Sequence, residues 1–135
     1  MTVSLALKLY ALAFGAFIVI DLVWLGLVAN GLYRRAMGHL MRDTPNWPVA
    51  IGFYLLFVAG LTYFAIAPAV TDGGVRDALV AGALYGLFTY ATFDLTCWAV
   101  LDRWPAWIVP IDIAWGTTLG ASVAAAAWLV NDATG

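Results

Sequence analysis

Three aspartates interrupt the apolar stretches of this sequence, and each has aromatic residues beside it at helical spacing. The acids are Asp21, Asp94 and Asp112, and the companions three or four positions away are Trp24, Tyr90, Trp98 and Trp115. Residues at these spacings share one face of a helix, so each carboxylate would project beside a flat, amphipathic ring. Carboxylates in apolar surroundings bind cations or protons, or serve as general acids and bases. We predict that these seven residues line one ligand-binding site.

A structural role for the same residues is the alternative. Buried aspartates also hold helices together by accepting hydrogen bonds from indole, phenol or hydroxyl groups. A charge at the centre of a membrane helix costs roughly 2.5–3.5 kcal/mol on insertion scales, so such residues are rare without a role. Asp21 lies deepest within its apolar stretch and carries the strongest case for function.

The elements that hold these residues are predicted from composition to be membrane helices. The 135 residues are 64% hydrophobic and only 10% charged, whereas soluble domains carry roughly a quarter charged residues. A span needs about 20 apolar residues, and every span in lipid must satisfy its own backbone groups as a helix. Four stretches qualify, at about residues 5–30, 48–67, 77–101 and 108–130. We predict an all-α, four-helix transmembrane bundle that forms one domain over residues 1–135.

The connection after the first span, residues 31–47, contains its own helical pattern. Arg34, Arg35, His39 and Arg42 fall on one side of a helix and Tyr33, Met37, Leu40 and Met41 on the other. This pattern predicts a short amphipathic helix in the interface, with its basic face toward the headgroups. The alternative is that the first helix continues for another turn or two.

Basic residues predict the orientation of the bundle. Arg34, Arg35, Arg42 and Arg103 fall on one side of the membrane and Lys8 and Arg76 on the other. An excess of lysine and arginine marks the cytoplasmic side, so we expect both termini outside. All three aspartates would then lie in the cytoplasmic half.

Small residues at four-residue spacing predict close helix contacts. Gly82 and Gly86, and likewise Gly116 and Gly120, form GxxxG pairs, and Ala11 with Gly15 imitates one. Such faces let helices approach closely, either within one chain or between the two copies of a homodimer.

Several function classes are excluded or disfavoured. The single histidine and single cysteine provide no metal cluster, disulfide or redox pair, and we predict no cofactor. A net charge of −2 without a basic run excludes nucleic acid as a partner, which leaves the lipid bilayer. Three hypotheses remain. We favour a protein that binds or transports a cation, a proton-coupled solute or a lipid-like ligand, ahead of a lipid-modifying enzyme or its accessory subunit, and of a structural subunit of a membrane complex.

The three aspartate-containing segments IDLVWLG, YGLFTYATFDLT and IDIAWGT, together with the four-span layout, resemble a family. This is the bacterial family of predicted inner-membrane proteins of the DUF2177 type, and the resemblance covers essentially the whole chain. It implies a multi-pass protein of the bacterial inner membrane. It implies no activity, cofactor or catalytic residue.

Overall fold

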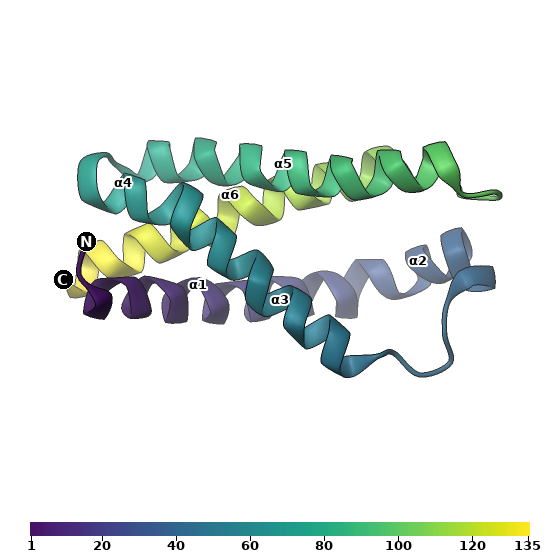
Figure 1. The fold of residues 1–135 in the computed structure, drawn as a ribbon, viewed down its shortest axis with the longest axis horizontal. Coiled ribbons are helices and arrows are strands. Elements are labelled where there is room, and N and C mark those ends of the chain that lie inside the picture. The colour runs from purple at the N-terminus through teal and green to yellow at the C-terminus, as the bar shows by residue number, and fades with distance from the viewer.

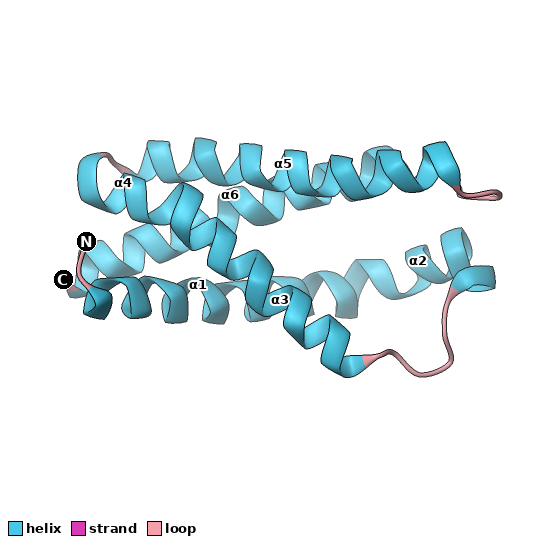
Figure 2. Cartoon of the chain, in the orientation of Figure 1, coloured by secondary structure: helices cyan, strands magenta, loops and turns pink.

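The protein is a bundle of helices (Figures 1 and 2). A computed structural model describes residues 1–135, except for the side chain of Asn30, and the described chain contains no strand. In chain order the elements are α1 (Val3–Trp24), η1 (Leu25–Ala29), α2 (Asn30–Met37), η2 (Gly38–Leu40), α3 (Trp47–Leu61), η3 (Thr62–Ile66), α4 (Ala67–Asp72), α5 (Val75–Val100) and α6 (Ile108–Thr134). η1 and η3 are π-helical turns and η2 is a 3-10 helix. The predicted all-α fold is confirmed.

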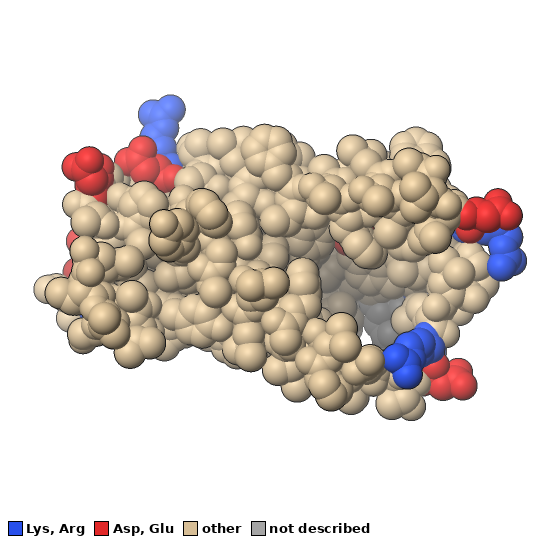
Figure 3. Space-filling view, viewed as in Figure 1, with Lys and Arg blue, Asp and Glu red and all other residues tan. Residues whose placement is uncertain are grey.

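Four continuous helical segments are long and apolar enough to cross a bilayer. They cover Val3–Ala29, Trp47–Asp72, Val75–Val100 and Ile108–Thr134, each beyond the roughly 20 residues that a hydrocarbon core requires. On the face shown in Figure 3, the lysine and arginine side chains lie at the two ends of the molecule, and the outer surface between them is almost entirely uncharged. Large apolar side chains are exposed along every span, which is the surface that lipid covers.

The second span continues past its predicted end at Ala67. The next residue is Pro68, and a proline usually stops a helix because it lacks an amide N–H and clashes with the preceding turn. The π-helical turn η3 precedes it and uses wider bonds, such as the one from the Ala67 N–H to the Thr62 carbonyl. This local widening accommodates Pro68 within the helical path, and α4 runs on to Asp72.

Helices α5 and α6 form the tightest contact in the bundle. Their two GxxxG pairs face each other, because a Cβ atom placed on Gly86 would lie 2.7 Å from the carbonyl carbon of Gly116. A Cβ atom on Gly82 would likewise lie 2.7 Å from the Cβ of Ala124. Only hydrogen side chains allow these backbones to approach so closely, so the glycines fix the antiparallel register of the pair.

Helix α3 crosses the bundle obliquely and diverges from α5 toward its N-terminal end (Figure 1). The second span meets α5 mainly through η3 and α4, at the end of the molecule that holds the chain termini. The first half of α3 therefore makes little contact with α5.

The amphipathic stretch after the first span is helical as predicted, and it follows α1 without a break. The π-helical turn η1 joins α1 to α2, which ends at Met37 before the turn η2. Residues 41–46 then form a non-helical connection to α3. The first helix thus continues through this segment, which was the alternative to the predicted separate interfacial helix.

The small-residue faces of the third and fourth spans are buried inside the single chain, against each other. The third such face has no neighbour within the chain: Ala11 and Gly15 are exposed, and a Cβ atom on Gly15 would meet nothing within 4 Å. A homodimer stays a prediction, and Ala11 with Gly15 is the small-residue face that remains for it.

Cysteine labelling will decide which side of the membrane the two ends face. Both termini lie at one end of the bundle, as four spans require (Figure 1). In a Cys97→Ala background, we expect Thr44→Cys in intact cells to react only with a membrane-permeant maleimide, because the excess of arginines predicts a cytoplasmic position. Asp72→Cys, at the opposite end, should react with an impermeant reagent. The reverse pattern would overturn the predicted orientation.

Candidate functional site

Asp94 and Asp112 lie on the contact face between α5 and α6. Steps of four along an antiparallel helix pair reach successive residues of the shared face. On α5 they are Gly82, Gly86, Tyr90 and Asp94, and on α6 they are Gly120, Gly116, Asp112 and Ile108. Gly82 meets Ala124 and Tyr90 meets Gly116 across this face, and the same antiparallel register places Asp94 beside Asp112.

Asp94 is the most deeply buried charged residue of the site. Its side chain is 1% exposed, and neither carboxylate oxygen has a hydrogen-bond donor among the described residues. The hydroxyls of Thr92, Thr89 and Thr117 do not supply one, because all three donate to carbonyls of their own helices. A buried carboxyl group without a donor is energetically costly, so Asp94 requires either a proton or a ligand.

Asp112 is 8% exposed and accepts a hydrogen bond from another part of the chain. The Tyr33 hydroxyl of α2 donates to the Asp112 carboxylate over 2.5 Å. That hydroxyl also accepts a hydrogen bond from the Trp24 indole nitrogen, over 3.4 Å. The Trp24 ring stacks on Trp115, with ring centres 4.3 Å apart and planes 7° from parallel. This network ties α1, α2 and α6 together around one carboxylate.

Tyr33 is held in its neutral, hydrogen-donating form. Burial raises the pKa of the Tyr33 hydroxyl far above its usual range, and the hydrogen bond to Asp112 and the charge of that carboxylate raise it further. A raised phenol pKa means that the proton stays on the oxygen throughout the physiological pH range. Tyr33 therefore remains a donor to Asp112.

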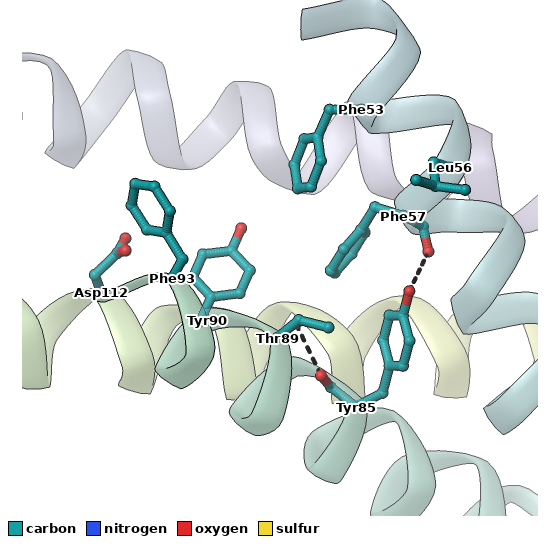
Figure 4. Close-up of a pocket in the computed structure, with 8 residues that line it drawn as sticks. All are labelled: Phe53, Leu56, Phe57, Tyr85, Thr89, Tyr90, Phe93 and Asp112. Carbon is teal, nitrogen blue, oxygen red and sulfur yellow. Dashed lines mark hydrogen bonds between the residues drawn. The ribbon is translucent and has the colours of Figure 1, made fainter. Parts of the chain in front are cut away.

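An aromatic cavity of about 500 Å³ opens between α3 and α5 (Figure 4). This is within the range of roughly 300–1,000 Å³ that is usual for ligand pockets. Apart from Asp112, which lies at one end, the wall is largely apolar. The lining residues are Phe53, Leu56, Phe57, Tyr85, Thr89, Tyr90, Phe93 and Asp112.

A smaller and more polar cavity of about 240 Å³ lies beside the first. Asp112, Tyr90 and Phe53 line both cavities, so the two are adjacent. Asp21 joins Asp112 on the wall of the smaller cavity. Its lining residues are Asp21, Trp24, Leu25, Tyr33, Ala50, Phe53, Tyr54, Tyr90, Asp112 and Trp115. No lysine or arginine is among the residues that line either cavity.

The larger cavity opens sideways from the bundle. Its wall on α3 includes Phe53 and Leu56, which are 52% and 72% exposed, and its wall on α5 includes the half-exposed Phe93. The hollow is visible between α3 and α5 on the face shown in Figure 3. Because these residues lie within membrane-spanning segments, the opening faces the hydrocarbon region of the bilayer.

The structure brings six of the seven residues predicted for the site into one neighbourhood. Five line the two cavities, and Asp94 adjoins them behind Asp112. Tyr90 lines both cavities together with Asp112, and the smaller one together with Asp21. Trp98 lies apart, 49% exposed and in neither cavity, because α6 begins at Ile108 and provides no partner for the next turn of α5.

Sequence reasoning missed Tyr33 as a site residue. In a regular α-helix, Tyr33 would lie about 120° around the axis from Asp21. The π-helical turn η1 lies between them and takes up one extra residue, which reduces the angle to about 20°. The face that Tyr33 occupies therefore depends on a local irregularity that hydrophobic periodicity does not reveal. Phe53 and Tyr54 were also missed, since no polar residue beside them marks their face.

Asp112 and Asp21 lie on the cavity walls, and Asp94 lies behind Asp112. Among the residues that the structure describes, no three His, Cys, Asp or Glu side chains are grouped closely enough to hold a metal ion. The aromatic rings suit a different ligand chemistry, because ring faces attract organic cations.

Removing the Tyr33 hydroxyl should destabilise the protein measurably. Tyr33→Phe leaves the buried Asp112 carboxylate without its tyrosine donor and the Trp24 indole without its acceptor. We expect a loss of about 1–3 kcal/mol, which thermal unfolding in detergent will detect as a lower Tm. Tyr63→Phe is the matched control. Tyr63 lies in the turn η3 and is 70% exposed, so this substitution should leave the Tm unchanged. Equal Tm values for the two variants would show that the network contributes no stability.

The fold and its site define a helical integral membrane protein with a carboxylate-containing cavity. A family model described as "Predicted membrane protein (DUF2177)" matches residues 6–129. The chain belongs to this family, as the three aspartate-containing segments indicated. No curated protein and no solved structure matches the chain.

Proposed function

We propose that the protein binds an amphipathic organic cation taken from the lipid phase. The apolar part of the ligand would lie among the aromatic rings between α3 and α5, and its positive head would lie between Asp112 and Asp21. The observation that carries this proposal is the position of Asp112. Its carboxylate ends the aromatic cavity and also lines the polar cavity that contains Asp21.

The charge of the site supports a cation over an anion. Two carboxylates line the space and no basic residue is among its lining residues, so an anionic head would meet only repulsion there. The rings of Phe53, Tyr54 and Tyr90 add cation–π attraction, which strengthens when the cation is desolvated. A simple metal ion would leave the aromatic cavity empty.

The lateral opening supports an amphipathic ligand over a water-soluble one. An exposed aromatic groove inside a membrane span is accessible to molecules that dissolve in the bilayer. Binding would remove the polar head from lipid and give it charged and hydrogen-bonding partners. Transport would be an extension of this binding and would require a second opening.

Binding of matched probes to the protein in lipid nanodiscs tests the proposal. Dodecyltrimethylammonium has both required parts, dodecanol has only the chain, and tetramethylammonium has only the head. We expect saturable binding of the first probe, seen in tryptophan fluorescence, at least tenfold tighter than that of the other two. If dodecanol binds equally well, the carboxylates do not contribute to binding. If tetramethylammonium binds equally well, the aromatic cavity does not contribute.

A further inference from the structure

Asp94 is the one buried carboxyl group that the proposed ligand would not touch. It lines neither cavity, yet it is 1% exposed, has no hydrogen-bond donor among the described residues and adjoins Asp112. Its burial removes it from water, and its neighbour on α6 is another acid. A role for Asp94 must therefore act through Asp112.

We infer that Asp94 and Asp112 share one proton in the empty site, and that an arriving cation replaces this proton. The inference rests on the proposed function, because the cation is the ligand described above. An O–H on one carboxyl group would donate to the other, which supplies the donor that Asp94 lacks. Asp112 would then accept from both Tyr33 and the shared proton.

Among the residues that the structure describes, the groups around the pair provide no other source of positive charge. Asp112 faces Tyr33 from α2, and Asp94 shares its helix face with Cys97 and Tyr90, three and four positions away. Tyr90 in turn faces Asp21 from α1 and Tyr54 from α3. All of these groups are neutral or acidic. Only a proton or a ligand can offset the second negative charge of the pair.

The exchange conserves the charge of the site. The empty pair holds two carboxyl groups and one proton, with a net charge of −1. When a monovalent cation reaches Asp112, the shared carboxyl O–H bond breaks and its proton passes to bulk water. Two carboxylates and one cation again carry −1. The protein thereby avoids a change of charge in a low-dielectric environment, which would be costly.

The variant Asp94→Asn distinguishes release of the shared proton from binding of the cation. The amide of Asp94→Asn donates an N–H to Asp112, as the protonated acid would, but it has no proton to release. This variant should bind dodecyltrimethylammonium without pH dependence. The wild type should bind it up to tenfold more tightly for each unit of increasing pH while the empty pair is protonated. Asp132→Asn, exposed at the end of α6, is the matched control and should behave as the wild type.

Two measurements on the nanodisc-embedded protein test the inference. A pH-sensitive dye in weak buffer should report about one proton released per cation bound by the wild type, and none for Asp94→Asn. Infrared spectra of the empty wild type should contain a protonated-carboxyl band that is missing from Asp94→Asn.

The outcomes separate this inference from the proposed function. Cation binding without proton release would overturn the exchange and leave the binding function intact. Absence of the infrared band would overturn the shared proton. Failure of the wild type to bind the cation would overturn the proposed function and the exchange with it, even if the band is present.

Discussion

Replacing Asp112 with asparagine should weaken binding of dodecyltrimethylammonium by about 30-fold or more. The substitution removes the negative charge that faces both cavities, and loss of one member of a desolvated charge pair costs roughly 2 kcal/mol or more. The amide oxygen still accepts a hydrogen bond, so the contact with Tyr33 and the shape of the cavity should persist. Titration of the nanodisc-embedded variant by tryptophan fluorescence measures the loss.

The exposed Asp132 provides the control for this experiment, because Asp132→Asn makes the same chemical change at the terminal end of the bundle. Its affinity for the probe should equal that of the wild type. Thermal unfolding should show that Asp112→Asn is still folded. Unchanged affinity in a folded Asp112→Asn protein would contradict a cation-binding role for this carboxylate.

An alanine at Gly86 should destabilise the bundle by about 1–3 kcal/mol or more, the range typical of overpacked cores. The new methyl group would lie 2.7 Å from the Gly116 carbonyl carbon and 3.2 Å from the Thr117 Cα atom. Both obstacles are backbone, so α5 and α6 would have to separate. Thermal unfolding in detergent should give a clearly lower Tm. Because the same register positions Asp94 against Asp112, probe binding should weaken as well.

Gly52→Ala is the matched control for this prediction. Gly52 is an exposed residue of α3, and a Cβ atom there would meet nothing within 4 Å. Alanine is the better helix former by roughly 1 kcal/mol, so this variant should be neutral or slightly more stable. If the two alanine variants have the same Tm, the glycine contact does not determine the packing of α5 and α6.

The sequence predicts the elements of this fold well because lipid imposes simple rules. Length and hydropathy identify the four spans, and the spacing of Gly82 and Gly86 identifies the tightest helix face. Asp94 continues that face in steps of four, so its burial between helices follows from the same pattern. These features depend only on composition and on the regular geometry of a helix.

The parts that the sequence did not reveal depend on departures from that regularity. Tyr33 reaches Asp112 because the π-helical turn η1 rotates α2 relative to α1. The second span passes Pro68 because η3 widens the helix before it. Trp98 continues the stripe of Asp94 but lies beyond the first turn of α6, and helix periodicity does not specify where the partner helix begins.

The lateral opening between α3 and α5 changes what an affinity means for this protein. A molecule that reaches the cavity through this opening has first dissolved in the bilayer, so its concentration there is a mole fraction in lipid and is set by its partition coefficient. Lipid acyl chains compete for the same aromatic surface. Affinity expressed per volume of water should therefore weaken in proportion to the lipid added, whereas affinity expressed per lipid molecule should stay constant.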